Sequence, residues 1–502
     1  MVVQHNMQAA NANRMLNVTT SAQSKSTEKL SSGYRINRAA DDAAGLTISE
    51  KMRKQIRGLD QASTNAQDGV SSVQTAEGAL TEVHSMLQRM NELATQAANG
   101  TNSKDSDRQA IQDEIDQLTT EIDRVSETTK FNETYLLKGE AGTKTINMKA
   151  HDAGLKGTLT DNGDGTATFV MDSLSIGDKV SIGGKNYTIG GDATDVNKML
   201  TDAKITDTDG AKVTVNGTEY TYYAAKPASN TGTKTDGWDA GWYAEKPKDG
   251  GNGDGATTKK GIYDSLTDIA ALAGATVSTG TKSVTLLNDA KDANGNNGHD
   301  GVSDTDATVI SRAKAYELAS NELLAANKIG DTENSAKVGV GDVDTKVNLT
   351  NGTGTFKIQT GSAKVANSLS FSLHVGADAD MTNKIQVNID AMDSASLGIK
   401  GLNVKDDSGN AATYAVDAIS DAISKVSSQR SSLGAVQNRL EHTINNLDNV
   451  VENTTTAESR IRDTDMAEEM VNYSKNNILA QAGQSMLAQA NQSNQGVLSL
   501  LQ

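Results

Sequence analysis

Residues Ala66 to Ala97 read AQDGVSSVQTAEGALTEVHSMLQRMNELATQA, and this stretch decides the class of fold. Apolar or small residues return there every three or four positions: Val70, Val73, Ala76, Leu80, Val83, Leu87, Met90, Ala94 and Ala97. That spacing is typical of the narrow stripe along a coiled-coil helix, not of the broad stripe on a globular core. The sequence therefore predicts a long helix that packs along other helices.

The helical pattern breaks and resumes further along the chain. Asn99 and Gly100 end the first helix, because both residues tolerate left-handed backbone. Ser106, with Gln109 three positions later, matches a capping box and predicts a new helix start. The stripe of this second helix consists of Ile111, Ile115, Leu118, Ile122 and Val125.

The C-terminal part of the chain, from about Ala411, mirrors the N-terminal part. Its first apolar stripe is Val416, Ile419, Ile423, Val426, Leu433, Leu440, Ile444, Leu447 and Val451. A further set follows at Leu479, Ala482, Met486, Val497, Leu500 and Leu501. Neither end carries a stripe wide enough to bury itself, so we expect the two ends to pair, although two independent coiled coils remain the alternative.

The middle of the chain, about 146–365, has a different pattern. Asp-Asn-Gly clusters alternate with short runs of strand character such as Lys212–Asn216 and Asn186–Ile189, which predicts hairpins. Helical stretches are expected near Ile262–Leu272 and Val309–Ala326. One more hairpin is expected at Leu369–Ile389, with Gly376–Asp380 near its turn. The predicted fold class is therefore α+β, with long antiparallel coiled-coil helices from both chain ends and a β-rich domain inserted between them.

The outermost segments, 1–32 and 461–502, are helical in period but rich in Asn, Gln and Ser. In an isolated chain they cannot bury enough apolar area to offset the entropy of ordering. We expect them to fold only where neighbouring copies supply the missing surface. This is the behaviour of a subunit that assembles.

Composition excludes several classes of function. The net charge of −17 argues against partners that bind through Lys and Arg, namely nucleic acid and anionic membranes. No stretch approaches the about 20 apolar residues of a membrane span, and Met1 to Leu16 lacks the apolar run of a cleavable signal. The absence of cysteine excludes thiol catalysis and disulfides.

No pattern in the sequence indicates an enzyme, a cofactor or a metal site. None of the histidines has a second His at metal-ligand spacing; they are His5, His84, His151, His299, His374 and His442. Asp161–Gly165 and Asp292–Gly298 are similar to calcium loops but lack the twelfth-position Glu in register, so we interpret them as turns.

Several stretches near both ends resemble bacterial flagellins. They are Leu30–Gly45 (LSSGYRINRAADDAAG), Ala62–Leu80, Leu87–Asn102, Ile111–Asn132, Ser432–Asn449 and Ala457–Gln502. The resemblance covers 1–140 and about 366–502, with the motifs in the family's order. It implies that 1–45 and 460–502 pair as inner-tube terminal helices. It also implies a helical shell of 46–145 and 366–459, with the hairpin near 369–389. The segment 146–365 would then be a variable outer insert of one or two subdomains.

The resemblance further implies a structural subunit, not an enzyme, in which many copies self-assemble into the flagellar filament for motility. It implies an extracellular location reached by flagellar type III export without a cleaved signal peptide. The expected partners are further copies of the chain, an export chaperone on the last helix and the filament cap. We expect the polymerisation seam to include Leu30, Ile36, Leu87, Ile111, Leu440, Leu479, Met486 and Leu500.

The resemblance also implies a host partner, the innate receptor Toll-like receptor 5. The family's receptor-binding Arg, Leu and Glu correspond to Arg89, Leu93 and Glu114, while Asn91 stands where many recognised members have Arg. Leu93 lies beside the coiled-coil stripe, so we expect it to serve both packing and recognition.

Two alternative functions remain at this point. A hook–filament junction protein shares the terminal helices but is expected to match less well at Leu30–Gly45 and at 111–132. A surface adhesin or carbohydrate-binding filament would act through the insert, where Trp238, Trp242 and Tyr243 could stack on sugar rings. The opposing interpretation is that these aromatic residues form the core of the insert.

Overall fold

The structure is a computed structural model that describes residues 6–99, 101, 106–230, 235–247, 263–280, 282–291, 298–406 and 409–499. The chain divides into two compact units. The first unit consists of Met1–Gln74, Ser370–Asn388 and Ser432–Gln502, and the second consists of Thr75–Leu369 and Ile389–Ser431. Two long helices, α2 (Ala43–Ala97) and α8 (Asn410–Arg462), contribute residues to both units.

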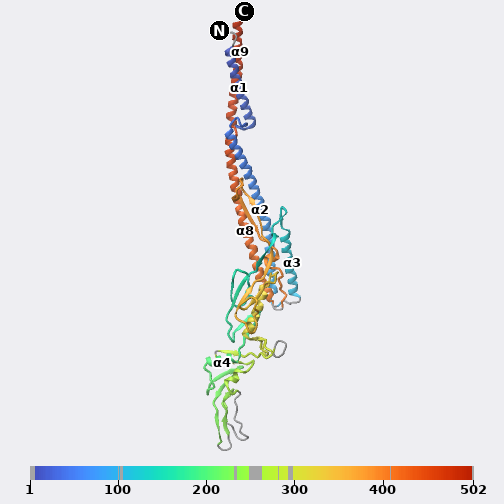
Figure 1. Ribbon diagram of the computed structural model, residues 1–502, viewed down its shortest axis with the longest axis vertical. Helices are drawn as coiled ribbons and strands as arrows, with labels where there is room; N and C mark the ends of the chain where they lie inside the picture. Colours follow the sequence, from blue (N-terminus) through green and yellow to red (C-terminus); the bar gives the residue numbers. More distant parts are fainter. Residues whose placement is uncertain are drawn as a thin grey trace. The chain divides into compact units, whose positions relative to one another are not determined.

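The two ends of the chain pair within the first unit. Helix α1 (Met7–Ser32) and helix α9 (Met466–Ser499) run antiparallel and side by side (Figure 1). Asn6 caps α1 by accepting a hydrogen bond from the Ala9 N–H, and its side-chain amide donates to the Ala490 carbonyl at 3.2 Å. The predicted pairing of the chain ends is confirmed.

A hairpin packs on the first-unit parts of α2 and α8. Strands β19 (Leu369–His374) and β20 (Lys384–Ile389) pair, with a 3-10 turn at Met381–Asn383 before β20, as the sequence predicts. A small core joins the hairpin to both helices; its buried members are Ala66, Val375, Ile385 and Leu440. The helices are antiparallel, because Ser49 donates to Glu458 at 2.8 Å and Ser63 to Asp448 at 3.1 Å.

The helical part of the second unit contains the stretch of sequence that predicts the coiled coil. Helix α3 (Asp107–Thr128) lies beside the C-terminal half of α2 (Figure 1). The predicted stripes are buried there; they include Leu80, Val83, Leu87, Met90, Ile115 and Ile122 together with Ile419 and Val426 of α8. Helix α3 starts directly after Ser106, as predicted, but the predicted capping box does not form. The Ser106 side chain makes no capping hydrogen bond, and its hydroxyl donates to the neighbouring carboxylate of Asp107.

Paired strands bring the two ends of the insert together. β3 (Glu140–Asn147) pairs antiparallel with β18 (Ser362–Asn367), and the short helix α7 (Ser394–Leu397) packs against β18. A tight hairpin of β1 (Lys130–Phe131) and β2 (Thr134–Tyr135) precedes β3. A long insertion can leave and re-enter a helical scaffold in this way without separating the helices that flank it.

The insert contains one core around α6 (Arg312–Asn327). A four-stranded sheet has the order β16 (Lys337–Gly339), β17 (Thr355–Gln359), β5 (Thr166–Met171), β4 (Gly157–Asp161). A second sheet has the order β15 (Val309–Ile310), β7 (Lys185–Ile189), β6 (Lys179–Ile182). Phe169 and Phe356 stack at the centre, with ring centroids 6.3 Å apart, and Tyr414 of α8 is part of the same core.

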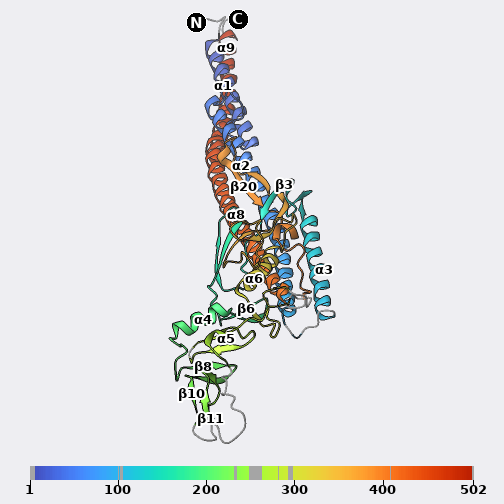
Figure 2. The ribbon, with the colours of Figure 1, turned by 60° about the horizontal axis from the view of Figure 1, so that its bottom comes forward.

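A second and separate core lies further into the insert. Its sheet has the order β12 (Gly241–Tyr243), β9 (Thr218–Tyr223), β8 (Lys212–Val215), β13 (Thr276–Ser278), β14 (Ser283–Thr285). Helices α4 (Ala193–Asp202) and α5 (Leu266–Ala270) contact each other beside this sheet (Figure 2). The hairpin of β10 (Lys226–Asn230) and β11 (Thr235–Trp238) completes this part.

The structure confirms the predicted fold class and corrects parts of the insert. Strands at Lys212–Val215 and Lys185–Ile189 confirm two predicted strands. The helix predicted at Val309–Ala326 begins later, because Ser311 caps it and the preceding β-branched pair forms β15. Helix α5 is only five residues long, and Ile262 of the predicted helix lies outside the described residues.

No helix in the described part of the chain is long and apolar enough to cross a lipid bilayer. The predicted domain boundaries at 45, 145, 365 and 460 are not tested by the division into two units, and they stay predictions.

Candidate functional site

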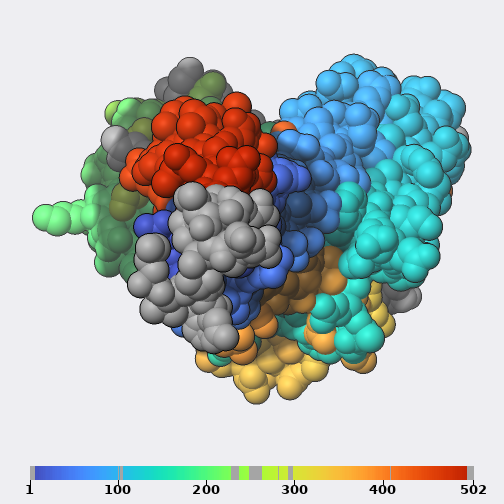
Figure 3. Space-filling model, turned by 90° about the horizontal axis from the view of Figure 1, so that it is seen from above, coloured from blue at the N-terminus to red at the C-terminus, as the bar shows by residue number. Residues whose placement is uncertain are grey.

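The paired terminal helices carry an uncovered apolar surface. Most of the exposed large hydrophobic side chains in the described residues lie on α1 and α9; they are Met7, Met15, Val18, Met466, Met470, Val471, Ile478, Leu479 and Met486. In Figure 3 the atoms of α9, in red, lie directly against those of the blue N-terminal helices. Contiguous exposed apolar surface of this kind is typical of protein interfaces.

The α1–α9 pair buries fewer apolar side chains than the α2–α8 pair does. Along α2 and α8 the apolar stripes are buried, for example at Leu80 and Leu440. Along α1 and α9 only Ser26 and Ala480 are buried among the side chains described. A helix pair gains most of its stability from the apolar area that it removes from water, so this pair is weakly held within one chain.

A groove runs between the two terminal helices. Met15 and Leu16 of α1 line it, together with Leu479, Gly483 and Met486 of α9. The helices are close at Gly483, where a Cβ would lie 3.4 Å from the Leu16 Cδ1, an ordinary van der Waals contact. A second, shallower apolar depression lies on α9 between Met470 and Leu479.

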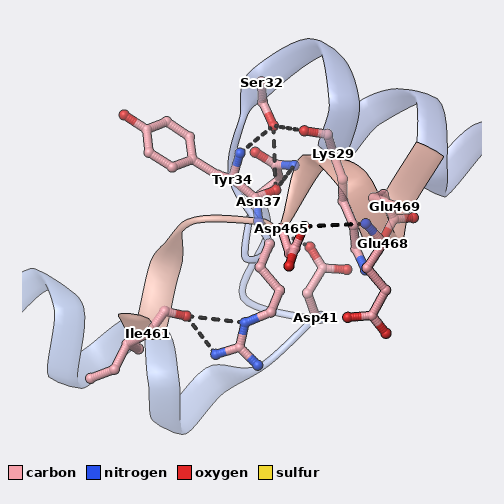
Figure 4. A network of polar contacts seen from close by, with 10 residues as sticks. Lys29, Ser32, Tyr34, Asn37, Asp41, Ile461, Asp465, Glu468 and Glu469 are labelled. Carbon is pink, nitrogen blue, oxygen red and sulfur yellow. Dashed lines mark hydrogen bonds and ion pairs between the residues drawn. The ribbon is translucent and has the colours of Figure 1, made fainter. Parts of the chain in front are cut away.

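A short two-stranded contact fixes the chain where α1 ends and α9 begins. The Arg35 N–H donates to the Arg462 carbonyl at 2.7 Å, and the Thr464 N–H donates to the Gly33 carbonyl at 3.0 Å. The Arg35 guanidinium also donates to the Ile461 carbonyl at 2.5 Å. Figure 4 shows this junction, with Lys29, Glu468 and Glu469 beside it.

Arg462 lies at the centre of the same junction. Its guanidinium stacks over the Tyr34 ring, 4.7 Å from the centroid, and forms an ion pair with Glu50 at 3.1 Å. Its side chain is mostly buried, whereas that of Glu50 is 57% exposed, so water screens the ion pair in part. The two contacts link the segment after α1, helix α2 and the end of α8 in one place.

The loop between α1 and α2 explains the Leu30–Gly45 motif. Gly33 ends α1 with φ +76, a left-handed conformation that favours glycine. Asp41 accepts backbone hydrogen bonds from Asn37 and Arg38, and the bond from Arg38 is the main cause that lowers the Asp41 pKa. At Gly45 a Cβ would lie 2.5 Å from the Asp42 carboxylate and 2.8 Å from the Cδ1 of the buried Ile36, so any larger residue would force these side chains to move.

The structure places the expected polymerisation residues in two groups. Ile36, Leu87, Ile111 and Leu440 are buried by packing within one chain, and Leu30 is half-buried. Leu479 and Met486 are exposed, and Leu500 lies outside the described residues. Packing within one chain therefore accounts for the buried group, and a role between copies stays a prediction for the exposed ones.

Of the three residues expected to face the receptor, the structure brings two together at the surface. The Arg89 Nε donates to the Glu114 carboxylate at 2.9 Å, across from α2 to α3. This hydrogen bond is the main cause that raises the Arg89 pKa, and a further one to Glu92 adds to it. Leu93 is buried, with 2% of its side chain exposed, so it lies beneath this surface and not on it.

The aromatic cluster in the insert is a core and not a sugar platform. Trp242 is fully buried, and its indole N–H donates to the Asp207 carboxylate at 2.8 Å. Tyr243 is buried as well. Trp238 is half-buried, with the Lys226 ammonium 4.9 Å from its ring centroid and its indole N–H bonded to the Ala224 carbonyl. This burial favours the core interpretation over carbohydrate stacking.

The loop at Asp161–Gly165 is a hairpin turn between β4 and β5. Asp161 accepts from the Gly163 N–H at 2.8 Å and Asp164 from the Thr166 N–H at 3.0 Å, as expected for turn chemistry. Most of the second such loop, Asp292–Gly298, lies outside the described residues, as does His5. Across the described ranges, no group of three His, Asp or Glu side chains is placed to hold a metal ion.

The fold and the exposed terminal pair define a class of protein: a chain with long coiled-coil helices whose two ends join and present an uncovered apolar face. Residues 3–142 match the bacterial flagellin N-terminal helical region, and residues 416–501 match the flagellin C-terminal helical region. The chain belongs to the bacterial flagellin family, whose members are structural proteins of the flagellar filament.

Similarity to individual flagellins extends over the whole chain. The chain is 38% identical to a flagellin of Clostridium tyrobutyricum over 99% of this chain and 100% of that protein. It is 34% identical to a flagellin of Bacillus subtilis (strain 168), with 100% of both chains covered. It is 36% identical to a flagellin of Salmonella rubislaw, covering 97% of this chain and 96% of that one.

Among solved structures, FliC from Burkholderia pseudomallei matches 74% of this chain and 99% of its own, at 19% identity and a TM-score of 0.24. That value is too low to support any argument about the arrangement of the parts.

Sequence reasoning did not identify the junction residues Tyr34, Arg35 and Arg462. The only local indication was the concentration of charged residues in one short segment, Arg460–Asp465, between helical patterns. Their partners lie more than 400 residues apart in the chain, as with Arg35 and Ile461 at a separation of 426.

Proposed function

We propose that copies of this chain assemble into the filament through the α1–α9 pair. The observation that carries this proposal is the row of exposed apolar side chains on two helices whose only fully buried side chains, among those described, are Ser26 and Ala480. Full burial of one such side chain contributes about 1.5–3 kcal/mol. Burial of several in one interface therefore offsets the association cost of about 4–15 kcal/mol.

A charge placed on this surface tests the proposal. Ile478 is 67% exposed on α9, so Ile478→Glu should leave the monomer stable while placing an unpaired charge inside the interface between copies. A matched control is Val170→Glu, on the outward face of β5 in the insert. We expect seeded polymerisation, followed by light scattering, to fail for Ile478→Glu and to proceed for Val170→Glu.

Circular dichroism of both variants is the control that checks whether their helix content matches that of the wild type. If Ile478→Glu polymerises at the wild-type rate, this part of α9 is not an assembly surface and the proposal fails.

We propose further that Toll-like receptor 5 contacts the α2–α3 surface at Arg89 and Glu114. The support is their ion pair at 2.9 Å on two neighbouring helices, with Arg89 and Glu114 each about half exposed. Buried Leu93 would support this surface from below. Arg89→Ala should weaken binding to the receptor ectodomain about tenfold, the loss of one charged anchor residue.

The control for the receptor experiment is Arg124→Ala, which removes another exposed arginine that pairs with a glutamate, Glu121, on α3. It should bind the ectodomain as the wild type does. Equal binding by both variants would contradict a receptor role for Arg89.

We also propose an extracellular location in the flagellum, with an export chaperone on α9 before assembly and the filament cap as partner at the growing tip. The support is that the exposed apolar part of α9 needs a cover in any compartment where the chain is unassembled. Expression in a flagellated bacterium that lacks its own flagellin should place the chain in surface filaments. Retention of the folded chain in the cytosol would contradict this.

A further inference from the structure

Methionine is the only sulfur-containing residue of this chain, and its exposure is unevenly distributed. The chain has 14 methionines and no cysteine. In the described residues, every exposed methionine except Met381 lies on α1 or α9; they are Met7, Met15, Met466, Met470 and Met486. Their side chains are between 49% and 74% exposed, whereas Met90, Met171, Met199 and Met392 are at most 5% exposed.

We infer that the five exposed methionines of the terminal helices are oxidation sites, and that their conversion to methionine sulfoxide by a peroxide blocks assembly. The inference rests on the proposed role of α1 and α9 as the assembly surface. It adds modification sites to that surface and links the oxidation state of the monomer's methionines to filament growth.

The chemistry needs only the thioether and the oxidant. The methionine sulfur attacks one oxygen of hydrogen peroxide, the O–O bond breaks, an S=O bond forms and water leaves. The sulfur loses two electrons and the peroxide gains them, so atoms and electrons balance. Because the chain has no thiol, no cysteine competes for the oxidant within it.

The effect on assembly follows from where these side chains lie. Met15 and Met486 line the groove between α1 and α9, and Met470 lines the apolar depression on α9. A flexible apolar side chain becomes a polar one with a strong acceptor, and burying that group without a donor is costly. The isolated chain is little affected, since water already solvates these side chains.

Peptide mapping by mass spectrometry tests the sites themselves, independently of assembly. The monomer is treated with limiting hydrogen peroxide, and sulfoxide is measured at each methionine over time. We expect the five terminal-helix methionines and Met381 to oxidise well before Met90, Met171, Met199 and Met392. Equal rates at exposed and buried positions would overturn the assignment of these sites.

Seeded elongation then tests the consequence. We expect the treated wild-type chain to elongate at least about tenfold more slowly than the untreated chain, and methionine sulfoxide reductases A and B to restore the rate. A variant with all five methionines changed to Leu should keep the ratio of treated to untreated rate near one. The matched control, Met381→Leu, removes an exposed methionine outside α1 and α9. After peroxide treatment it should elongate more slowly, as the wild type does.

The outcomes separate the two proposals. If the untreated wild type does not elongate, the proposed assembly function fails. If it elongates and the treated chain does so equally well, or the reductases restore nothing, the oxidation inference fails alone. Should the five-Leu variant not assemble, the wild-type treatment and its enzymatic reversal decide the question.

Discussion

Arg108 is a buried cation that joins two segments of the second unit. Its side chain is 3% exposed, and it donates to the Ala97 carbonyl at 3.0 Å and to the Asp406 carbonyl at 2.7 Å. The first of these bonds satisfies a carbonyl at the end of α2, and the second holds the loop before α8. A buried charge that is bound through such contacts is sensitive to the loss of either partner.

Arg108→Ala should therefore destabilise the second unit. Each hydrogen bond to a charged group contributes about 1.5–3 kcal/mol, so we expect the loss of both to lower the free energy of unfolding by about 3–6 kcal/mol. Urea unfolding of the monomer measures it. Arg124→Ala, at an exposed ion pair with Glu121, is the control and should show little change; a small effect at Arg108 would contradict its anchoring role.

Tyr414 links α8 to the core of the insert. Its hydroxyl donates to the Glu322 carboxylate of α6 at 2.6 Å, and its ring belongs to the insert core. Burial, followed by the Glu322 carboxylate, raises the Tyr414 pKa well above its ordinary value. The folded state therefore holds this proton more tightly than the unfolded state does.

The sign of the pH dependence follows from that shift. Tyr414 stabilises the second unit fully below the unfolded tyrosine pKa of about 10, and this contribution is lost as the pH rises above that value. Tyr414→Phe should lower stability at pH 8 by about 1.5–3 kcal/mol. Between pH 10 and 11.5, the free energy of unfolding should fall less for Tyr414→Phe than for the wild type. Urea titrations of both proteins at these two pH values measure the difference. Equal losses in the two proteins would contradict the role of the Tyr414 hydroxyl.

At the scale of elements, helix α2 shows how close packing of a hairpin can favour glycine inside a helix. Glycine is unfavourable in a helix interior, yet α2 contains Gly58, Gly69 and Gly78. At Gly69 a Cβ would lie 2.2 Å from the Leu373 Cδ1 of the hairpin and 3.3 Å from the Leu440 Cδ1 of α8. At Gly78 a Cβ would meet nothing within 4 Å.

These two glycines give a matched pair of substitutions in one helix. Gly78→Ala should stabilise the monomer by about 0.5–1 kcal/mol, because alanine is the better helix former and the space is open. Gly69→Ala should instead destabilise it by about 1–2 kcal/mol, because the Leu373 side chain must move out of its packing against α2 and α8. Thermal unfolding by circular dichroism measures both, and stabilisation by both variants would contradict the close approach of the hairpin.

Local sequence patterns predicted those helices and strands in which the spacing of apolar residues determines the buried face. Leu80 and Leu87 lie seven positions apart on α2, and the burial of both follows from that period alone. The β-branched pair Val309–Ile310 was assigned to a helix, since its pairing with β7 involves residues more than 100 positions away. Helix α4 was missed because a short capped helix among turn residues has too few positions to show a period.

At the scale of the whole molecule, the sequence indicated a subunit that assembles but not how the chain ends are joined. The polar composition of 1–32 and 461–502 predicted that these helices bury little alone, and among the described side chains of α1 and α9 only Ser26 and Ala480 are buried. The junction of Arg35 with Ile461 and of Arg462 with Tyr34 left no periodic pattern, because each contact joins single residues from opposite ends of the chain.

The most direct test of the central claim is electron microscopy of the full-length chain after seeding, beside a variant that lacks residues 1–45 and 460–502. We expect the full-length chain to form long tubes of helical symmetry and the shortened chain to stay monomeric. If the shortened chain assembles equally well, or neither chain assembles, the terminal helices are not the assembly device.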